Sequence, residues 1–244
     1  MNIQIVGWND DFNGIRKQII LDVMEIMQTF FKNEALYTKD LIICNIHSVK
    51  CPFVDENPCT HFDRSRICLT TTGLYWCQFV HQLSHELCHC STSKAQLPQS
   101  IKWFDEFICC CSSFLVEKYI SISTNTQYNY MFGINTPQAF NDYLEIEEDG
   151  HIYQIENVKE FAEEHVPKYE IDENLIKKHD VYVREFFNKI GANWQGLSFV
   201  GKIWKIDINN SISIKEYLSK LISICNSEEQ EALRIISDIF GICY

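Results

Sequence analysis

The segment His85-Glu86-Leu87-Cys88-His89 places two metal-binding side chains and one carboxylate within five residues. A helix advances about 100° per residue, so His85 and His89 would lie about 40° apart around the axis and one turn apart along it. Both imidazoles can then bind one zinc ion. Glu86 is expected to bind no metal and to take a proton from the water that attacks a substrate carbonyl. The segment therefore predicts hydrolytic chemistry.

A third ligand is expected because catalytic zinc usually has three protein ligands and one open position. Downstream of the histidines, Pro98 indicates a turn, and the residues after it predict a second helix. If the turn reverses the chain, Glu106 on that second helix returns beside His85 and His89. The sequence therefore predicts zinc bound by two histidines and Glu106.

Across residues 65–120 the chain resembles the gluzincins, thermolysin-like zinc metallopeptidases whose third ligand is a glutamate on the following helix. His85, His89 and Glu106 match the ligands of that family, and Glu86 matches its general base. The residues Trp103-Phe104-Asp105-Glu106 resemble the start of the glutamate helix in many small members. Around the glutamate the chain departs from the common pattern, with Asp105, Phe107 and Cys110. The resemblance implies a zinc-dependent peptidase.

The resemblance does not identify every residue that would support the zinc ligands and the substrate. A zinc-binding histidine usually donates a hydrogen bond from its second ring N–H to an acceptor, for which Asp105 and Glu117 are the candidates. In gluzincin-like folds the strand before the histidine helix, here residues 65–72, often offers its edge to an extended peptide. An oxyanion donor is also needed, and four residues are candidates by their distance along the chain: Tyr143, His151, His165 and His179.

Other histidines and cysteines have alternative interpretations. A second, structural zinc site could form from a group that lacks tight C-x-x-C pairs: Cys44, His47, Cys51, Cys59 and His61. Cys88 and Cys90 are expected to pack in the helix, because coordination by either would close the catalytic site. His81 lies eight residues before His89, too far along a helix to share one compact site with both ligands, and is expected to line the cleft. Most of the remaining cysteines are expected to be small buried residues.

Composition restricts the classes of partner. The 244 residues carry a formal net charge of −12, and nucleic-acid binding depends on clustered Lys and Arg, so no nucleic-acid partner is expected. Neither a secretory signal nor an apolar run of membrane-spanning length is found, so we expect no membrane contact and a cytoplasmic location. The sequence does not indicate an oligomeric state.

The periodicity of apolar residues predicts an α+β fold, with a small sheet packed on the histidine helix and the glutamate helix, followed by a mainly helical half. We expect residues 1–124 to form the zinc metallopeptidase-like domain and residues 125–244 a helical domain, with 125–142 as a linker or a loop over the cleft. Residues 196–207 are expected to form a strand or a buried connector. The predicted strands are 3–6, 41–46 and 65–72; the predicted helices are 10–31, 74–91, one after Pro98, 157–166, 172–190, 213–225 and 228–240.

Two functions follow from these features. The first is a zinc-dependent peptidase that acts on a peptide or protein substrate, with Glu86 as the general base. The second is a zinc-containing binding protein without catalytic activity, whose helical carboxy-terminal half binds a protein partner.

Overall fold

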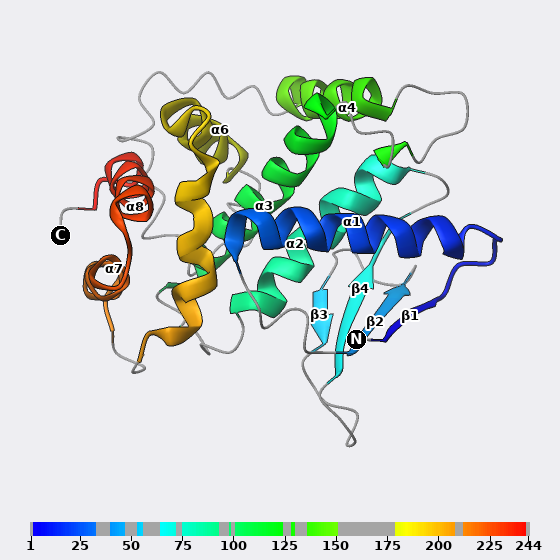
Figure 1. Cartoon of the computed structure of the whole chain (residues 1–244), viewed down its shortest axis with the longest axis horizontal. Coiled ribbons are helices and arrows are strands. Elements are labelled where there is room, and N and C mark those ends of the chain that lie inside the picture. The colour runs from blue at the N-terminus through cyan, green and yellow to red at the C-terminus, as the bar shows by residue number, and fades with distance from the viewer. Residues whose placement is uncertain are drawn as a thin grey trace. The chain divides into compact units, whose positions relative to one another are not determined.

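The computed structural model describes residues 2–32, 40–46, 53–55, 64–71, 75–92, 98, 101–123, 128–129, 136–150, 179–207 and 212–242. The chain forms an α+β fold of two compact units, which confirms the predicted fold class (Figure 1). The first unit comprises residues 1–29, 34–90 and 112–149; the second comprises 30–33, 91–111 and 150–244. The division expected after residue 124 stays a prediction.

A four-stranded sheet in the order β1-β2-β4-β3 belongs to the first unit. Three strands are parallel and match the predicted ones: β1 (Ile3–Val6), β2 (Asp40–Asn45) and β4 (Arg64–Leu69). The fourth strand, β3 (Phe53–Asp55), pairs antiparallel with β4 and was not predicted. Three residues are too few to display an alternating pattern, which explains why the sequence did not reveal it.

The expected free edge of the strand before the histidine helix is not observed. β4 lies between β2 and β3, and its residues Arg66, Ile67 and Cys68 pair with β3. A strand that is hydrogen-bonded on both sides cannot accept an extended peptide at those residues. The expectation that residues 65–72 guide a substrate by their edge is therefore wrong for this stretch.

Helix α1 (Asn13–Phe31) carries the predicted apolar side, from which Ile19, Val23 and Met27 are buried. Its first turn also contains Arg16, a fully buried cation. The guanidinium donates two hydrogen bonds to Asp10, at 2.6 and 2.7 Å, and stacks 4.7 Å from the ring centre of Trp8 and 5.6 Å from that of Trp76. Because Trp76 is the first residue of the next helix, this cluster fixes where that helix begins.

Helices α2 (Trp76–Thr92) and α3 (Lys102–Ile122) are the predicted histidine and glutamate helices. Two serines of α3 bind the backbone of α2 within the first unit: the Ser112 hydroxyl donates to the Ser84 carbonyl at 3.1 Å, and Ser113 donates to the His81 carbonyl at 2.9 Å. Side chains this small allow the backbones of two helices to approach closely. The two hydrogen bonds fix the position of α3 along α2 and so determine which residues of α3 face the histidines.

Helix α4 (Thr136–Gly150) corrects the expectation that residues 125–142 form a linker or loop, because Thr136–Asp142 are helical. Pro137 lies in the first turn of α4, where the missing N–H of proline breaks no helical hydrogen bond. The polar composition of this stretch concealed the helix.

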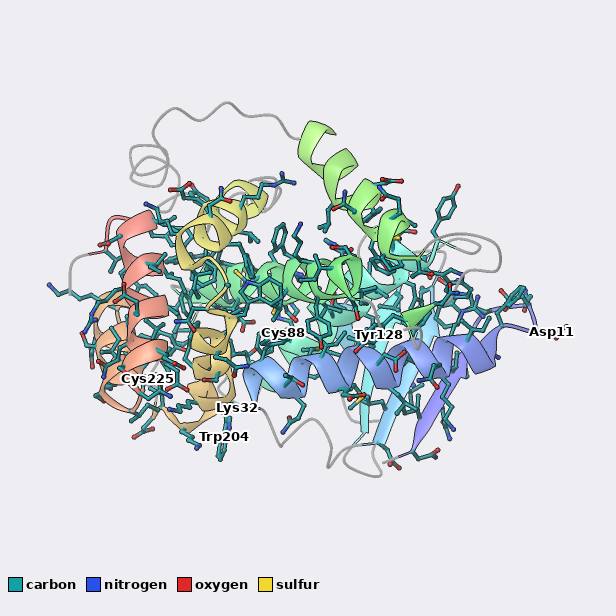
Figure 2. All side chains as sticks on the ribbon, turned by 45° about the horizontal axis from the view of Figure 1, so that its top comes forward. Asp11, Lys32, Cys88, Tyr128, Trp204 and Cys225 are labelled. Atoms are coloured by element: carbon teal, nitrogen blue, oxygen red, sulfur yellow. The ribbon has the colours of Figure 1, made fainter. Side chains whose placement is uncertain are left out.

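The second unit contains three predicted helices, α6 (His179–Ile190), α7 (Ile214–Ser223) and α8 (Ser227–Ile239). The first two lie within the predicted ranges, and α8 is shifted by one residue toward the amino terminus. The predicted helix 157–166 lies outside the described residues. Residues 196–207 are no strand: the 3₁₀ helix η7 (Trp194–Lys205) occupies most of them. Seven residues of η7 are buried, as expected of a connector, whereas Trp204 is exposed (Figure 2).

An aromatic core holds the second unit together. The ring of Phe240 lies 4.8 Å from Trp103, 5.0 Å from Phe107 and 4.7 Å from Tyr182, measured between ring centres. Trp103 and Phe107 lie in the first turns of α3, whereas Phe240 caps the end of α8. These contacts anchor the beginning of α3.

Over the described part of the chain, no helix is both long and apolar enough to cross a membrane.

Candidate metal centre

One face of α2 is accessible and the rest of the helix is buried. The half-buried positions recur at helical spacing: Gln78, His81, Gln82, His85 and His89. Val80, Leu83 and Leu87 lie on the other side and are fully buried. The amphipathic pattern of α2 thus turns the histidines away from the core and leaves them accessible to a metal ion.

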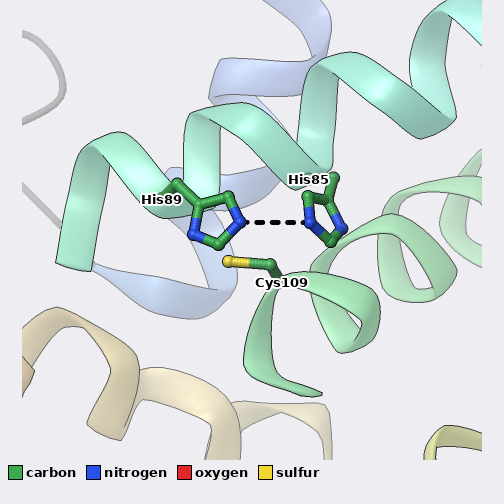
Figure 3. A group of neighbouring side chains, drawn as sticks. All are labelled: His85, His89 and Cys109. Carbon is green, nitrogen blue, oxygen red and sulfur yellow. Dashed lines mark hydrogen bonds between the residues drawn. The ribbon is translucent and has the colours of Figure 1, made fainter. Parts of the chain in front are cut away.

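His85 and His89 point toward each other across one turn of α2 (Figure 3). Their Nε2 atoms are 3.1 Å apart, and the ring centres are separated by 4.8 Å at an interplanar angle of 71°. In a tetrahedral zinc site with Zn–N bonds of about 2.05 Å, two ligand nitrogens lie about 3.3 Å apart. The 3.1 Å spacing of the two imidazole nitrogens is that of a hydrogen bond and is also close to the spacing of two nitrogens that bind one metal ion.

Cys109 of α3 completes a group of three metal-binding side chains (Figure 3). One ligand atom from each of His85, His89 and Cys109 lies within 4.8 Å of the other two. α3 is one continuous helix, so the position of Cys109 follows from the hydrogen bond that Ser112, three residues later, makes with α2. These three residues could hold a metal ion.

Cys109 was not predicted as a metal ligand, because most of the remaining cysteines were expected to be small buried residues. That interpretation fits their burial, since Cys109 and Cys111 are fully buried. The missed signal is helical spacing: Cys109 follows Glu106 by three residues, so the two share a face of α3. A helix face that presents Glu106 to the histidines presents Cys109 as well.

The two glutamates expected in the site lie on different helices. Glu86 is on α2 directly after His85, and its side chain is only 3% exposed. Glu106 is half-buried on α3 and is not a member of the three-residue group found among the described residues. Its assignment as a zinc ligand stays a prediction, as does the role of Glu86 as a base.

Glu117, one of the two candidate acceptors, lies beside His81. Its Oε2 atom is 3.3 Å from Nδ1 of His81, and the glutamate is 1% exposed. Asp105, the other candidate, is half-buried in the first turn of α3. The side chain of His81 is 30% exposed and occupies the turn of α2 before His85.

Tyr143 is the one oxyanion candidate whose side chain the structure describes. Its ring centre lies 6.2 Å from that of His81 in an edge-to-face arrangement. His179 begins α6, and only its backbone is described. His151 and His165 lie outside the described residues.

Of the second cysteine and histidine group, only Cys44 is described. Its Sγ atom lies 3.3 Å from Sγ of Cys68, the residue paired with it in the neighbouring strand. His47, Cys51, Cys59 and His61 lie outside the described residues, so the predicted structural zinc site stays a prediction.

Comparison with protein-family models, with curated proteins and with solved structures finds no match to this chain.

Proposed function

We propose that the protein is a zinc-dependent hydrolase that cleaves peptide bonds, with His85 and His89 as zinc ligands and Glu86 as general base. The observation that carries the proposal is the 3.1 Å separation of the two Nε2 atoms on the helix that also carries Glu86. Two nitrogens at that spacing suit one tetrahedral zinc ion, and Glu86 follows the first ligand directly. The gluzincin resemblance points to the same reaction.

Each residue has a separate task in this reaction. When bound, zinc polarises a substrate carbonyl and lowers the pKa of a water molecule. Glu86 accepts the proton that this water loses and returns it to the amine that leaves when the C–N bond breaks. Since Glu86 is almost fully buried, little solvent screens its charge, and its interaction with the reacting proton is stronger than it would be in bulk water.

The third ligand distinguishes an enzyme from a binding protein. If either Glu106 or Cys109 joins the two histidines, three protein ligands leave one position open for substrate, as catalytic zinc requires. If both join them, four ligands close the site, and zinc then only stabilises the fold. This second arrangement supports the alternative function, a binding protein whose helical carboxy-terminal half contacts a protein partner.

A peptide or protein substrate is favoured over nucleic acid because the net charge is −12. We further propose that the enzyme acts in the cytoplasm, in keeping with the absence of a membrane-crossing helix among the described residues.

The test is to incubate the zinc-loaded full chain with a mixed pool of synthetic peptides and to detect products by mass spectrometry. Cleavage should stop with a zinc chelator and should be absent in Glu86→Gln. The matched control is Gln78→Ala on the same accessible face of α2, which should cleave like the wild type. If Glu86→Gln cleaves at the wild-type rate, or if zinc-loaded wild type cleaves nothing, the proposal fails.

A further inference from the structure

Two cysteines of the first unit lie side by side near the carboxyl ends of neighbouring parallel strands. Cys44 of β2 is paired directly with Cys68 of β4, so both side chains extend from the same face of the sheet. Their Sγ atoms are 3.3 Å apart. Neither thiol takes part in the hydrolysis proposed above.

The spacing of the two strands suits a covalent bond between these thiols. Neighbouring strands of a sheet lie about 4.7–4.9 Å apart, and a disulfide joins residues whose Cα atoms are about 4.4–6.8 Å apart. The two Sγ atoms are already in contact, and an S–S bond of about 2.05 Å requires them to approach further. Rotation of the two side chains can supply this approach, so the strands keep their register.

The two thiols differ in their access to solvent. Cys44 is 8% exposed, whereas Cys68 is 1% exposed. The Cys44 thiol also donates a hydrogen bond to the carbonyl oxygen of Ile67 at 3.3 Å, which holds its sulfur beside the residue that precedes Cys68. A small oxidant from solvent therefore reaches Cys44 first, and Cys68 lies beside it as the second thiol.

We propose that Cys44 and Cys68 form a reversible disulfide between β2 and β4 when hydrogen peroxide oxidises Cys44. In the first step the Cys44 sulfur attacks the peroxide: an S–O bond forms, the O–O bond breaks, and the thiol proton leaves in a water molecule. In the second step the Cys68 sulfur attacks the sulfenic acid of Cys44: an S–S bond forms, the S–O bond breaks, and a second water leaves with the Cys68 proton. The two thiols together give two electrons to the peroxide, and a thiol reductant returns them by exchange.

Cys225 of the second unit provides a matched control. It is 9% exposed, close to Cys44, but burial raises the pKa of its thiol to about 12, so little of the reactive thiolate is present. Cys225→Ser should therefore react with peroxide like the wild type.

The experiment treats the reduced full chain with hydrogen peroxide, blocks the remaining thiols in denaturant and maps the disulfides by tandem mass spectrometry. Trypsin cuts after Lys50 and Arg66, so Cys44 and Cys68 fall in separate peptides that the disulfide would join. Wild type and Cys225→Ser should yield this linked pair, and dithiothreitol should release it.

Single variants test the order of the two steps. In Cys68→Ser the sulfenic acid should persist on Cys44 and react with dimedone, a trap for sulfenic acids. In Cys44→Ser, Cys68 should stay a free thiol, because the oxidant does not reach it. Oxidation should raise Tm of the wild type, since the bond links positions 24 residues apart and restricts the unfolded chain. Neither variant should show that increase.

Three results would overturn the proposal. The first is that Cys44 and Cys68 stay free thiols in the wild type while glutathione in the same solution is oxidised. The second is a disulfide from either residue to another cysteine in place of the linked pair. The third is a Tm that does not rise once the linked pair has formed, because the bond would then strain the sheet.

Discussion

Nε2 of His85 and Nε2 of His89 lie 3.1 Å apart on consecutive turns of α2. Two imidazole nitrogens that face each other at this distance form one hydrogen bond at most, whereas a zinc ion between them would use the lone pairs of both. This relationship, with Glu86 beside it, is the basis of the proposed function.

Zinc should stabilise the folded protein. A ligand that binds only the folded state adds about 2.7 kcal/mol at a free concentration one hundred times its Kd, so zinc should raise Tm measurably. His85→Ala and His89→Ala should lose most of this increase, while Gln78→Ala should keep it. Differential scanning calorimetry with and without zinc measures the effect. An equal Tm increase in all four proteins would place the zinc elsewhere.

Cobalt substitution should identify the third ligand. A thiolate bound to Co²⁺ gives an intense near-ultraviolet charge-transfer band, and a carboxylate does not. If Cys109 coordinates, as its place within 4.8 Å of the histidines indicates, the band should be present in the wild type and absent in Cys109→Ser. Glu106→Gln should then keep the band. Absence of the band in the wild type, with weaker metal binding in Glu106→Gln, would instead favour the predicted His, His, Glu site.

The pair formed by Asp10 and Arg16 should stabilise the first unit. Asp10→Asn leaves the buried guanidinium without its anionic partner, so the free energy of unfolding should fall by about 3 kcal/mol, the lower end of the range for broken buried pairs. The double variant Asp10→Ala with Arg16→Met removes both charges and should be more stable than Asp10→Asn. Urea denaturation of the three proteins measures this order. If the double variant is the least stable, the penalty does not come from an unpaired buried charge.

The same pair predicts a pH dependence. The hydrogen bonds from Arg16 hold the pKa of Asp10 below its ordinary value, so the pair stabilises the fold fully above the unfolded pKa of about 3.9. This contribution is lost as the pH falls through the lower folded pKa. Between pH 5 and pH 2 the free energy of unfolding should therefore fall more steeply in the wild type than in Asp10→Asn. Parallel curves would contradict the prediction.

Substitution of two glycines by alanine should have opposite effects on stability, because the space around them differs. A methyl group at Gly201 in η7 would clash with the backbone carbonyl of Phe31, so Gly201→Ala should lower the free energy of unfolding by about 1–3 kcal/mol. In α1, Gly14 has nothing within 4 Å of the added methyl group, so Gly14→Ala should stabilise by about 0.5–1 kcal/mol. Thermal unfolding of both variants measures the contrast. Equal effects of the two substitutions would contradict the packing around η7.

Long periodic segments were predictable from the sequence. The helix 74–91 was predicted because its apolar residues recur about every 3.6 residues. The same spacing places His85 and His89 on the accessible face. β3 and α4 were not found, since the first is too short and the second begins in a polar stretch. Arg16 was missed because nothing local in the sequence indicates that a cation packs between two tryptophans.

The start of α8 shows how tertiary contacts decide between two local patterns. Ser227 and Gln230 predict a capping box, but the structure forms it one residue earlier, between Asn226 and Glu229. Glu229 also accepts a hydrogen bond from Ser198 at 2.7 Å and pairs with Lys202, both in η7. Ser198 and Lys202 hold the Glu229 side chain in place and so favour the capping box that begins at Asn226. The same reasoning applies to Cys109, whose place beside the histidines depends on the pairing of α2 and α3.

The most direct test is the position of zinc in a crystal of the zinc-loaded protein, located by anomalous diffraction on both sides of the zinc edge. The account predicts one strong anomalous peak, about 2.0–2.1 Å from Nε2 of both His85 and His89, with the Glu86 carboxylate near the ion but not bound to it. A peak at another site, or a Glu86 oxygen bound directly to the zinc, would contradict it.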